Sequence, residues 1–324
     1  MNKHHRTLEL DRVLEMLAEQ TTCPAGRELA RRLTPNDNYR DAADALQRTA
    51  DINSLCARYG TPGLGGIRDC TGALQRAKLG ARLSAGEILQ VAQVLRTVRS
   101  IKKWRGQGEI PTAADDLFHL LAPVEGLEKD IFDAILSEEE LADSASPALA
   151  DLRRRIRRAQ LKVREQLDGI IRSPQYAKAL QEPIVTMRDG RFVVPVKIEC
   201  KNEVKGLVHD TSSSGATVFI EPMAVVDANN EIRLLQNEEQ LEIDRILQEF
   251  SERIGQVADA TRTSFEALLQ LDLLFAKSRL ADKMKATVPA LNEDGIIEFR
   301  KARHPLIQKD KVIPVDIRLG DGFD

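Results

Sequence analysis

Aromatic residues and long hydrophobic runs are both scarce in this sequence. Aromatic side chains make up 4% of its 324 residues, whereas 42% of the residues are hydrophobic and 30% are charged. No apolar run approaches the roughly 20 residues of a membrane-spanning helix, and the N-terminus is polar rather than signal-like. We therefore expect a cytoplasmic protein without a membrane partner. The abundance of leucine, alanine, arginine and glutamate favours long helices over extensive sheet.

Cysteine is equally sparse, and its spacing excludes the common metal and disulfide frameworks. The four cysteines contain no C-x-x-C pair, so we expect reduced thiols and no metal site: Cys23, Cys56, Cys70 and Cys200. A large charge of one sign is also missing, because the formal net charge is -3. A uniformly basic nucleic-acid coat is thereby excluded, and any such binding must come from local basic patches.

The length of the chain allows two or three domains, and residues 1–145 predict the first of them. Short apolar stripes alternate there with turns rich in glycine, proline and asparagine, which is typical of a helical core domain. Ser84 and Glu87 have the spacing of a capping box, so we expect a helix to begin at this point.

Residues 146–182 predict an outgoing helix with a narrow apolar seam. Its first part repeats apolar residues at spacings of three and four: Leu149, Leu152, Ile156, Ala159 and Val163. Ile170 continues in the same phase, whereas Leu167 falls outside it. Charged residues fill the remaining positions, so the helix should pack against one partner, as in an antiparallel coiled coil.

Residues 183–222 abandon the helical pattern and predict a small antiparallel sheet of about four strands. Two β-rich runs flank Asp189 and Gly190, a pair that tolerates the positive φ of a tight hairpin turn. A second pair of runs, 206–209 and 217–220, is joined by a serine-rich loop. Pro195 cannot donate to a ladder and should lie at an edge or a bulge.

Helical periodicity returns over residues 223–290, where acidic residues complement the basic outgoing segment. The order of long helix, small sheet and long helix predicts a sheet at the tip of an antiparallel helical pair. Residues 291–324 then contain two strand-like runs, and two strands alone are at best marginal in water. The predicted fold class is therefore mostly α with a small antiparallel β domain, followed by the first strands of another domain.

Four stretches of the sequence resemble one known family. Residues 186–197 (TMRDGRFVVPVK) and 206–222 (GLVHDTSSSGATVFIEP) are similar to the MutS type 2 family, the bacterial paralogue of MutS that is not used in mismatch repair. The tetrapeptide at 303–306 (RHPL), followed by 313–317 (IPVDI), looks like the entry to the ATPase domain of MutS-type proteins. The resemblance covers essentially the whole chain.

The resemblance implies a helical core domain, long lever helices with a β-containing clamp at their tip, and a truncated ATPase domain that begins at 291–324. In that family the ATPase domains dimerise, use ATP and magnesium, and are followed by a nuclease domain. No G-x-x-x-x-G-K-[ST] motif occurs in this sequence. We therefore expect an N-terminal fragment with no catalytic residue, no cofactor of its own, and no ATP hydrolysis or DNA cleavage.

Three functions are compatible with the resemblance. The chain could belong to a dimeric clamp that binds branched DNA and suppresses homologous recombination. It could belong to a sensor that binds and splits stalled or collided ribosomes. A third alternative is a dimerisation and lever module that binds no nucleic acid, and the net charge of -3 keeps this alternative open.

Clusters of basic residues supply the candidate contacts with DNA or the ribosome. In the predicted sheet these candidates are Arg188, Arg191, Lys197, Lys201 and Lys205, and on the outgoing helix they are Arg154 and Arg158. One interpretation is a set of salt-sensitive contacts with phosphates. The other is a solvated face that pairs with the acidic returning helix.

Other candidate sites have ordinary structural explanations. His209, Asp210 and the serines at 212–214 suggest a hydrolytic triad, but adjacent strand residues point to opposite faces, so a hydrogen-bonded turn is the better interpretation. We expect His304 to be a buried structural histidine. By the resemblance alone, Val312 and Ile313 lie where MutS-type ATPases offer an apolar edge to adenine.

Overall fold

The computed structural model describes residues 7–320 and 322, apart from 109, 125 and 309. The chain divides into two compact units. The helical unit combines Met1–Phe132 with Phe250–Asp324, and the sheet unit comprises Asp133–Glu249. Within the part of the chain that is described, no helix is long and apolar enough to cross a membrane.

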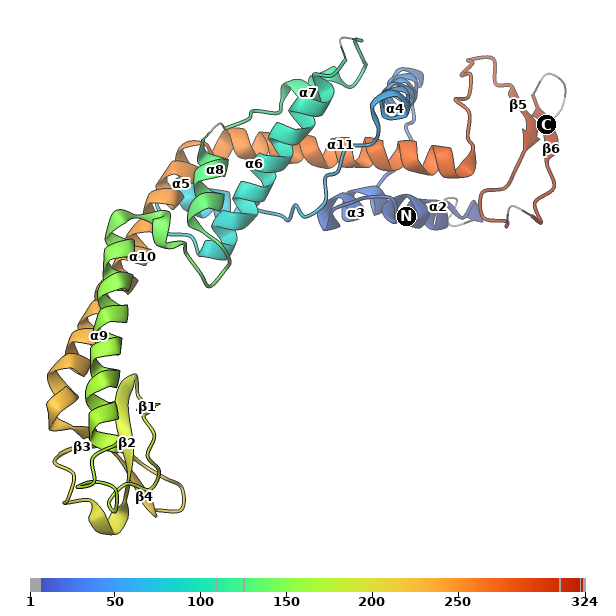
Figure 1. The fold of residues 1–324 in the computed structure, drawn as a ribbon. Helices are drawn as coiled ribbons and strands as arrows, with labels where there is room; N and C mark the ends of the chain where they lie inside the picture. The colour runs from blue at the N-terminus through green and yellow to red at the C-terminus, as the bar shows by residue number, and fades with distance from the viewer. Residues whose placement is uncertain (1–6, 109, 125, 309, 321, 323–324) are drawn as a thin grey trace. The chain divides into compact units, whose positions relative to one another are not determined.

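Helices make up most of the helical unit (Figure 1). Its elements are α2 (Leu10–Ala18), α3 (Pro24–Arg31), α4 (Tyr39–Tyr59), α5 (Thr71–Lys78), α6 (Ala85–Arg105), α7 (Asp115–His119), most of α8 (Leu127–Ala134), the end of α10 (Met223–Gln256), α11 (Ala258–Met284), β5 (Ile297–Ala302) and β6 (Val315–Leu319).

Helix α11 is the centre of the helical unit, because it contacts every helix from α2 to α7. Phe275 of α11 is fully buried and meets the ring of Trp104 edge-on, with 5.5 Å between the ring centroids. The indole of Trp104 donates a hydrogen bond of 3.0 Å to the carbonyl of Gly60. A large aromatic ring whose one polar group is satisfied is well suited to such a core.

The capping box predicted at Ser84 is confirmed at the start of α6. The Ser84 hydroxyl accepts from the backbone N–H of Glu87 at 3.3 Å, and the Glu87 carboxylate accepts from the backbone N–H of Ser84 at 3.0 Å. These reciprocal bonds satisfy backbone donors that would otherwise be unpaired in the first turn. The helix therefore begins where the sequence predicts.

A buried carboxylate joins α11 to the beginning of α3. Asp272 is fully buried and accepts from the backbone N–H and the hydroxyl of Thr22 at 3.0 and 2.8 Å. The backbone N–H and thiol of Cys23 each lie 3.3 Å from the same carboxylate. A β-carbon at Gly26 would overlap this carboxylate, so glycine is required here. Since the α3 dipole also favours a negative charge at this end, Asp272 fixes α3 on α11.

Strands β5 and β6 form a separate two-stranded antiparallel sheet. Ile297 lies opposite Leu319, and Phe299 lies opposite Ile317. All of these apolar side chains are exposed. A two-stranded sheet with exposed apolar residues has little intrinsic stability.

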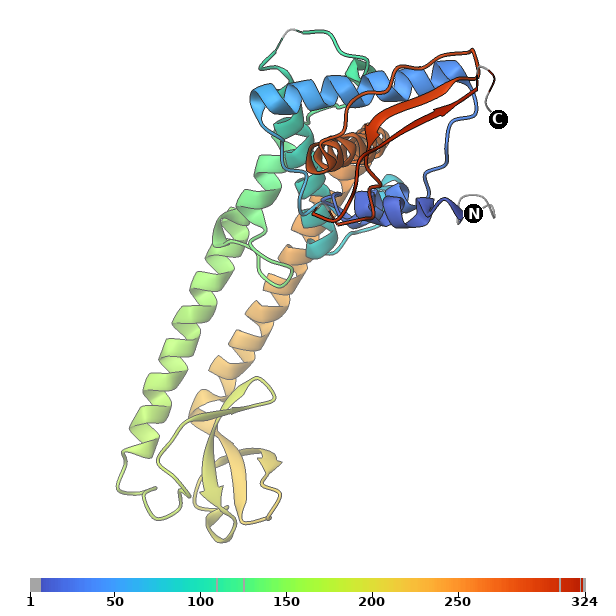
Figure 2. The ribbon, with the colours of Figure 1, turned by 90° about the vertical axis from the view of Figure 1, so that its right-hand side faces the viewer.

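The sheet unit contains a four-stranded antiparallel sheet and two long helical segments (Figure 2). Its elements are α9 (Pro147–Ile171), β1 (Thr186–Arg188), β2 (Arg191–Lys197), β3 (Gly206–Thr211), β4 (Thr217–Pro222), the first part of α10 and the short 3-10 turns at Asp143–Ala145 and Ile198–Cys200. The strand order is β1-β2-β4-β3, so β1 and β3 are the edge strands. The predicted mostly helical fold with a small antiparallel sheet is confirmed.

The turn between β1 and β2 has the predicted geometry. Asp189 and Gly190 have φ angles of 49° and 73°, as a hairpin turn with two left-handed residues requires. Strand β1 pairs with β2 only as far as Val193. Pro195 therefore lies beyond the β1 ladder, and its carbonyl accepts from the backbone N–H of Gln181 at 3.0 Å. The missing N–H of the proline interrupts no pairing with β1.

One face of the sheet packs against the last turns of α9 and the first turns of α10. The core at this place is apolar and consists of Ala159, Val163, Leu167, Ala179, Leu180, Val194, Val196, Val204, Val218, Ile220, Val225 and Ile232. The sheet thus lies at one end of the paired helical segments of its own unit (Figure 2).

The apolar seam of α9 differs slightly from the predicted one. Leu167, which the predicted repeat leaves out, is fully buried, whereas Ile170 is only partly buried. A straight helix has 3.6 residues per turn, so the buried stripe drifts away from a strict heptad. The helix ends at Ile171, and turns follow where the sequence predicts helix up to 182.

Candidate nucleic-acid interface

The two faces of the four-stranded sheet differ because alternate strand residues point in opposite directions. Val218 and Ile220 belong to the core on the inner face. Phe219, which lies between them, points to the outer face together with Pro195, its partner on β2. Lys197 is two residues beyond Pro195 and has the same orientation. The outer face therefore carries an aromatic ring and one of the candidate lysines.

Arg188 lies across this outer face. Its guanidinium carbon is 4.0 Å from the centroid of the Phe219 ring, and its Nε lies 3.2 Å from a carboxylate oxygen of Asp210. The same guanidinium donates a bond of 3.0 Å to the carbonyl of Met187. The side chain keeps 39% of its surface exposed, so Arg188 is held in place but remains accessible.

Arg191 belongs to a buried polar network. Its guanidinium lies 2.8 and 3.0 Å from the two carboxylate oxygens of Glu221, which is fully buried, and 2.8 Å from the side-chain oxygen of Asn230. Asn229 donates to Glu221 at 2.8 Å. A buried carboxylate needs this kind of compensation. In this structure the guanidinium of Arg191 neutralises Glu221 and ties β2 and β4 to α10.

His209 contacts the same carboxylate rather than a serine. Its Nε2 lies 2.5 Å from Glu221, at a point where β3 shifts register against β4. The Ser212 hydroxyl instead accepts from the backbone N–H of Thr217 at 3.1 Å and lies 3.3 Å from the hydroxyl of Ser214. These are the structural hydrogen bonds of a turn, as the sequence predicts.

The three candidate lysines are spread along the sheet. Lys197 lies opposite Thr217 at the start of β4, and its ammonium donates 3.1 Å to the carbonyl of Lys178. The carbonyl of Lys205 accepts from the backbone of Met223, just beyond the other end of β4. Lys201 lies in the intervening loop. The side chains of Lys201 and Lys205 are exposed and have no carboxylate partner among the described residues.

The basic residues of α9 fall into two groups. Arg153 is bound to Glu239 and Asp143, each at 2.7 Å, and so links α9 to α10 and to the preceding 3-10 turn. Arg154 and Arg158 lie opposite the apolar seam and are exposed. Arg154 pairs with Asp151 one turn earlier, whereas Arg158 has no acidic partner in the described part of the chain. Pairing with the acidic returning helix therefore describes Arg153, whereas Arg158 remains a candidate for contact with phosphates.

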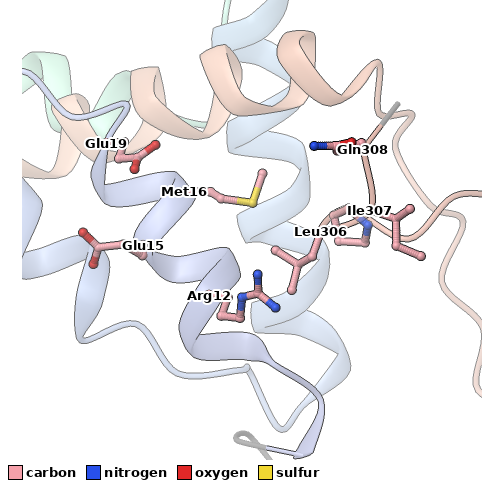
Figure 3. A pocket seen from close by; sticks show the side chains of 8 residues that line it. Arg12, Glu15, Met16, Glu19, Leu306, Ile307 and Gln308 are labelled. Atoms are coloured by element: carbon pink, nitrogen blue, oxygen red, sulfur yellow. The ribbon is translucent and has the colours of Figure 1, made fainter. Parts of the chain in front are cut away.

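The candidate adenine edge is exposed in this chain. Ile313 keeps 79% of its surface accessible, and Val312 is partly buried. The adjacent loop forms an open pocket of about 460 Å³ against α2, lined by Arg12, Glu15, Met16, Glu19, Pro305, Leu306, Ile307 and Gln308 (Figure 3). The prediction that His304 is buried is wrong, because its side chain is 50% exposed and 4.0 Å from Glu9. A two-stranded sheet offers too little cover to bury it.

Sequence patterns did not indicate the partners of the candidate residues. Glu221 and Asn229 are close to Arg191 only because β4 and α10 fold against β2. The sequence does contain a signal for Phe219, because it lies between Val218 and Ile220, and alternation along a strand places it on the opposite face from these two apolar residues. Between residues 7 and 320, outside the three internal gaps, no group of three or more His, Cys, Asp or Glu residues is arranged to hold a metal.

Comparison with known proteins shows extensive similarity along the chain. The protein called endonuclease MutS2 in Acetivibrio thermocellus is 43% identical over 323 residues, which cover 98% of this chain and 41% of that protein. The protein of the same name in Ruminiclostridium cellulolyticum is 44% identical over 99% of this chain and 41% of its own length. The protein of the same name in Pelotomaculum thermopropionicum is 43% identical over 98% of this chain and 41% of its own length. No protein-family profile matches the sequence.

Fold and composition define a mostly helical protein with a small antiparallel sheet, and the comparisons specify it further. The chain belongs to the MutS type 2 family. It spans about two fifths of the length of the curated relatives that it matches, since the covered share is 41% in each of these three.

Proposed function

We propose that this chain forms the core, lever and clamp of a dimeric, ATP-driven MutS-type clamp that binds branched DNA and suppresses homologous recombination. Residues of the sheet unit would make the DNA contacts. The helical unit would connect them to the ATPase domain. Cleavage of nucleic acid, which the name endonuclease attributes to the relatives, would require residues outside this chain.

The observation that carries the proposal is the contrast between paired and unpaired cations in the sheet unit. Arg191 and Arg153 are occupied by carboxylates of their own unit. Lys201, Lys205 and Arg158 are exposed and have no such partner among the described residues. Basic side chains without an acidic neighbour bind phosphates without first breaking an internal ion pair. These three residues would therefore contribute most to DNA binding.

Two features support an ATPase domain that begins at β5. The apolar side chains of β5 and β6 are exposed on a sheet of two strands, which would be stabilised by further strands. The curated relatives are also much longer than this chain. In the complete protein we expect ATP and magnesium to bind in that domain, with Val312 and Ile313 at its adenine edge. Dimerisation would occur through the same domain.

The affinity of the chain for a four-way DNA junction at several salt concentrations tests the proposal. Each phosphate neutralised by a lysine or arginine contributes about -0.9 to the slope of log affinity against log salt for duplex DNA. With Lys201, Lys205 and Arg158 in contact, the slope should be about -2 to -3. An affinity that does not change with salt would contradict direct contact with phosphates.

Comparing junction binding with co-sedimentation of the chain and stalled ribosomes distinguishes the alternative functions. Ribosomal RNA presents the same phosphate chemistry, so co-sedimentation with stalled ribosomes in preference to binding of junction DNA would assign these cations to the ribosome. If the chain binds neither, it would act only as a dimerisation and lever module that binds no nucleic acid.

A further inference from the structure

We propose that Arg188, stacked on Phe219, forms a platform for one unpaired nucleobase on the outer face of the sheet. The proposal rests on the proposed function and specifies it, since it assigns the clamp a preference for nucleic acid with unstacked bases. Branched DNA and folded RNA both contain such bases. The ligand chemistry is a planar heterocycle next to a phosphate.

The guanidinium plane of Arg188 is fixed from three directions. Phe219 supports it at 4.0 Å from the ring centroid, Asp210 binds its Nε at 3.2 Å, and the Met187 carbonyl accepts from it at 3.0 Å. A guanidinium held in this way loses little further conformational freedom when a ligand binds. Nucleobases stack on arginine planes as they do on aromatic rings.

The Arg188 side chain remains accessible despite these contacts. Phe219 occupies the side toward the sheet, and the Arg188 side chain still exposes 39% of its surface. Lys197 lies on the same face, two residues along β2 from Pro195, the partner of Phe219. A stacked base with a lysine nearby for its phosphate is the combination that single-stranded nucleic-acid sites use.

Arg96 of the helical unit is a second arginine that lies over a phenylalanine ring, and its side chain is 46% exposed. Arg96 lies 3.5 Å from the centroid of Phe132, but its Nε is bound to Glu128 at 3.1 Å, and Glu128 also binds Arg99. Glu128 is buried, so this stack belongs to the packing between α6 and α8. The Asp210 partner of Arg188 is 47% exposed and lies on the outer face. Arg96 therefore provides a matched control.

The test compares two branched DNAs that differ only in their bases. Both carry the same short single-stranded flap on a duplex, and in one of them abasic sugars replace the flap bases, so the phosphates are identical. The wild-type chain should prefer the flap with bases by about tenfold, because a stacked base contributes on this scale. Arg188→Lys keeps the positive charge but removes the plane, so this preference should fall to about onefold, with unchanged affinity for the abasic flap. The Arg96→Lys control should keep the full preference.

The outcomes separate this inference from the function on which it rests. If wild type and Arg188→Lys bind both flaps equally and with the same salt dependence, the platform is wrong and phosphate binding stands. If the wild type binds neither flap nor duplex, both proposals are wrong. The same pair of flaps made of RNA identifies the source of the base: a larger base-dependent preference in RNA than in DNA would assign the platform to RNA. Equal thermal unfolding of both variants and the wild type verifies that they are folded.

Discussion

At the scale of single residues, Glu221 is the most constrained ionisable group of the sheet unit. It is fully buried and receives bonds from Arg191, His209 and Asn229. Its carboxylate therefore holds β2, β3, β4 and α10 together through one side chain. A buried network of this kind stabilises a fold only when every member has a partner.

Glu221→Gln should destabilise the chain by about 3 kcal/mol or more, because the substitution leaves the mostly buried guanidinium of Arg191 without a counter-charge. Guanidinium denaturation followed by circular dichroism measures this loss. Glu182→Gln, which changes an exposed carboxylate of the same unit, serves as the control and should alter the free energy of unfolding by less than about 0.5 kcal/mol. Equal stability of the two variants would show that Glu221 is not a structural centre.

Cysteine reactivity provides a second prediction for single residues. Cys23, Cys56 and Cys70 are buried, whereas Cys200 is partly exposed. Burial raises the pKa of the Cys23 and Cys70 thiols to about 12, so almost no thiolate is present at pH 8. Ellman's reagent should therefore modify about one thiol per folded chain and all four after unfolding. Cys200→Ser should abolish the native reaction, and a native reaction that persists in this variant would contradict the burial of the other three.

How well the sequence predicted single residues depended on how far their partners lie along the chain. Ser84 and Glu87 were paired correctly, because a capping box is set by local spacing. The same holds for Asp189 and Gly190, whose turn requires only local backbone geometry. The side-chain partners of Arg188 and Arg191 lie 22 to 39 residues away and come together only after the sheet has formed. Periodicity carries no information about such contacts.

At the scale of elements, the pairing of α9 with α10 is held by apolar and ionic contacts together. Leu152, Ile156 and Leu235 form a small buried cluster between the two helices. At the beginning of α9, the N-cap residue Ser146 donates a bond of 2.6 Å to Glu242 of α10. The buried seam matches the predicted one from Leu149 to Val163 and departs from it at Leu167, because the helix follows a 3.6-residue period rather than a strict heptad.

Glu242 makes the stability of this helix pair depend on pH. Hydrogen bonds from Arg245 and then from Ser146 lower the pKa of Glu242 from 4.5 to about 2. A carboxylate whose pKa is lower in the folded state stabilises the fold fully above its unfolded pKa and loses this effect as the pH falls toward the folded value. The contribution of Glu242 should therefore be present at pH 7 and decline between pH 4.5 and about 2.

Glu242→Gln should lower the free energy of unfolding at pH 7 by about 1–2 kcal/mol, a range that allows for solvent screening of the exposed Arg245. The variant should also lose less stability than the wild type between pH 5 and pH 3. Urea denaturation at each pH measures both effects. Glu238→Gln, an exposed carboxylate 3.9 Å from Arg155, is the control. A parallel pH dependence of wild type and Glu242→Gln would refute this assignment.

At the scale of the whole molecule, the described chain consists of two compact units. The helical unit has a continuous core around α11, and the sheet unit presents cations on an otherwise acidic chain. The net charge of -3 predicts that basic residues gather only in local patches. The structure adds which of these basic residues have acidic partners. The sequence could not show this difference, because Lys201 and Arg191 are both basic residues of the predicted sheet and look equally suitable for binding phosphate.

Cations without internal partners in the sheet unit are proposed here to bind nucleic-acid phosphates. The most direct measurement compares the salt dependence of junction binding for the wild type, the double variant Lys201→Ala/Lys205→Ala, and the control Lys103→Ala/Lys129→Ala, which removes two exposed lysines of the helical unit. The slope for the sheet-unit variant should be about 2 smaller in magnitude than that of the wild type, and the control should retain the wild-type slope. Identical slopes for all three proteins would contradict the claim.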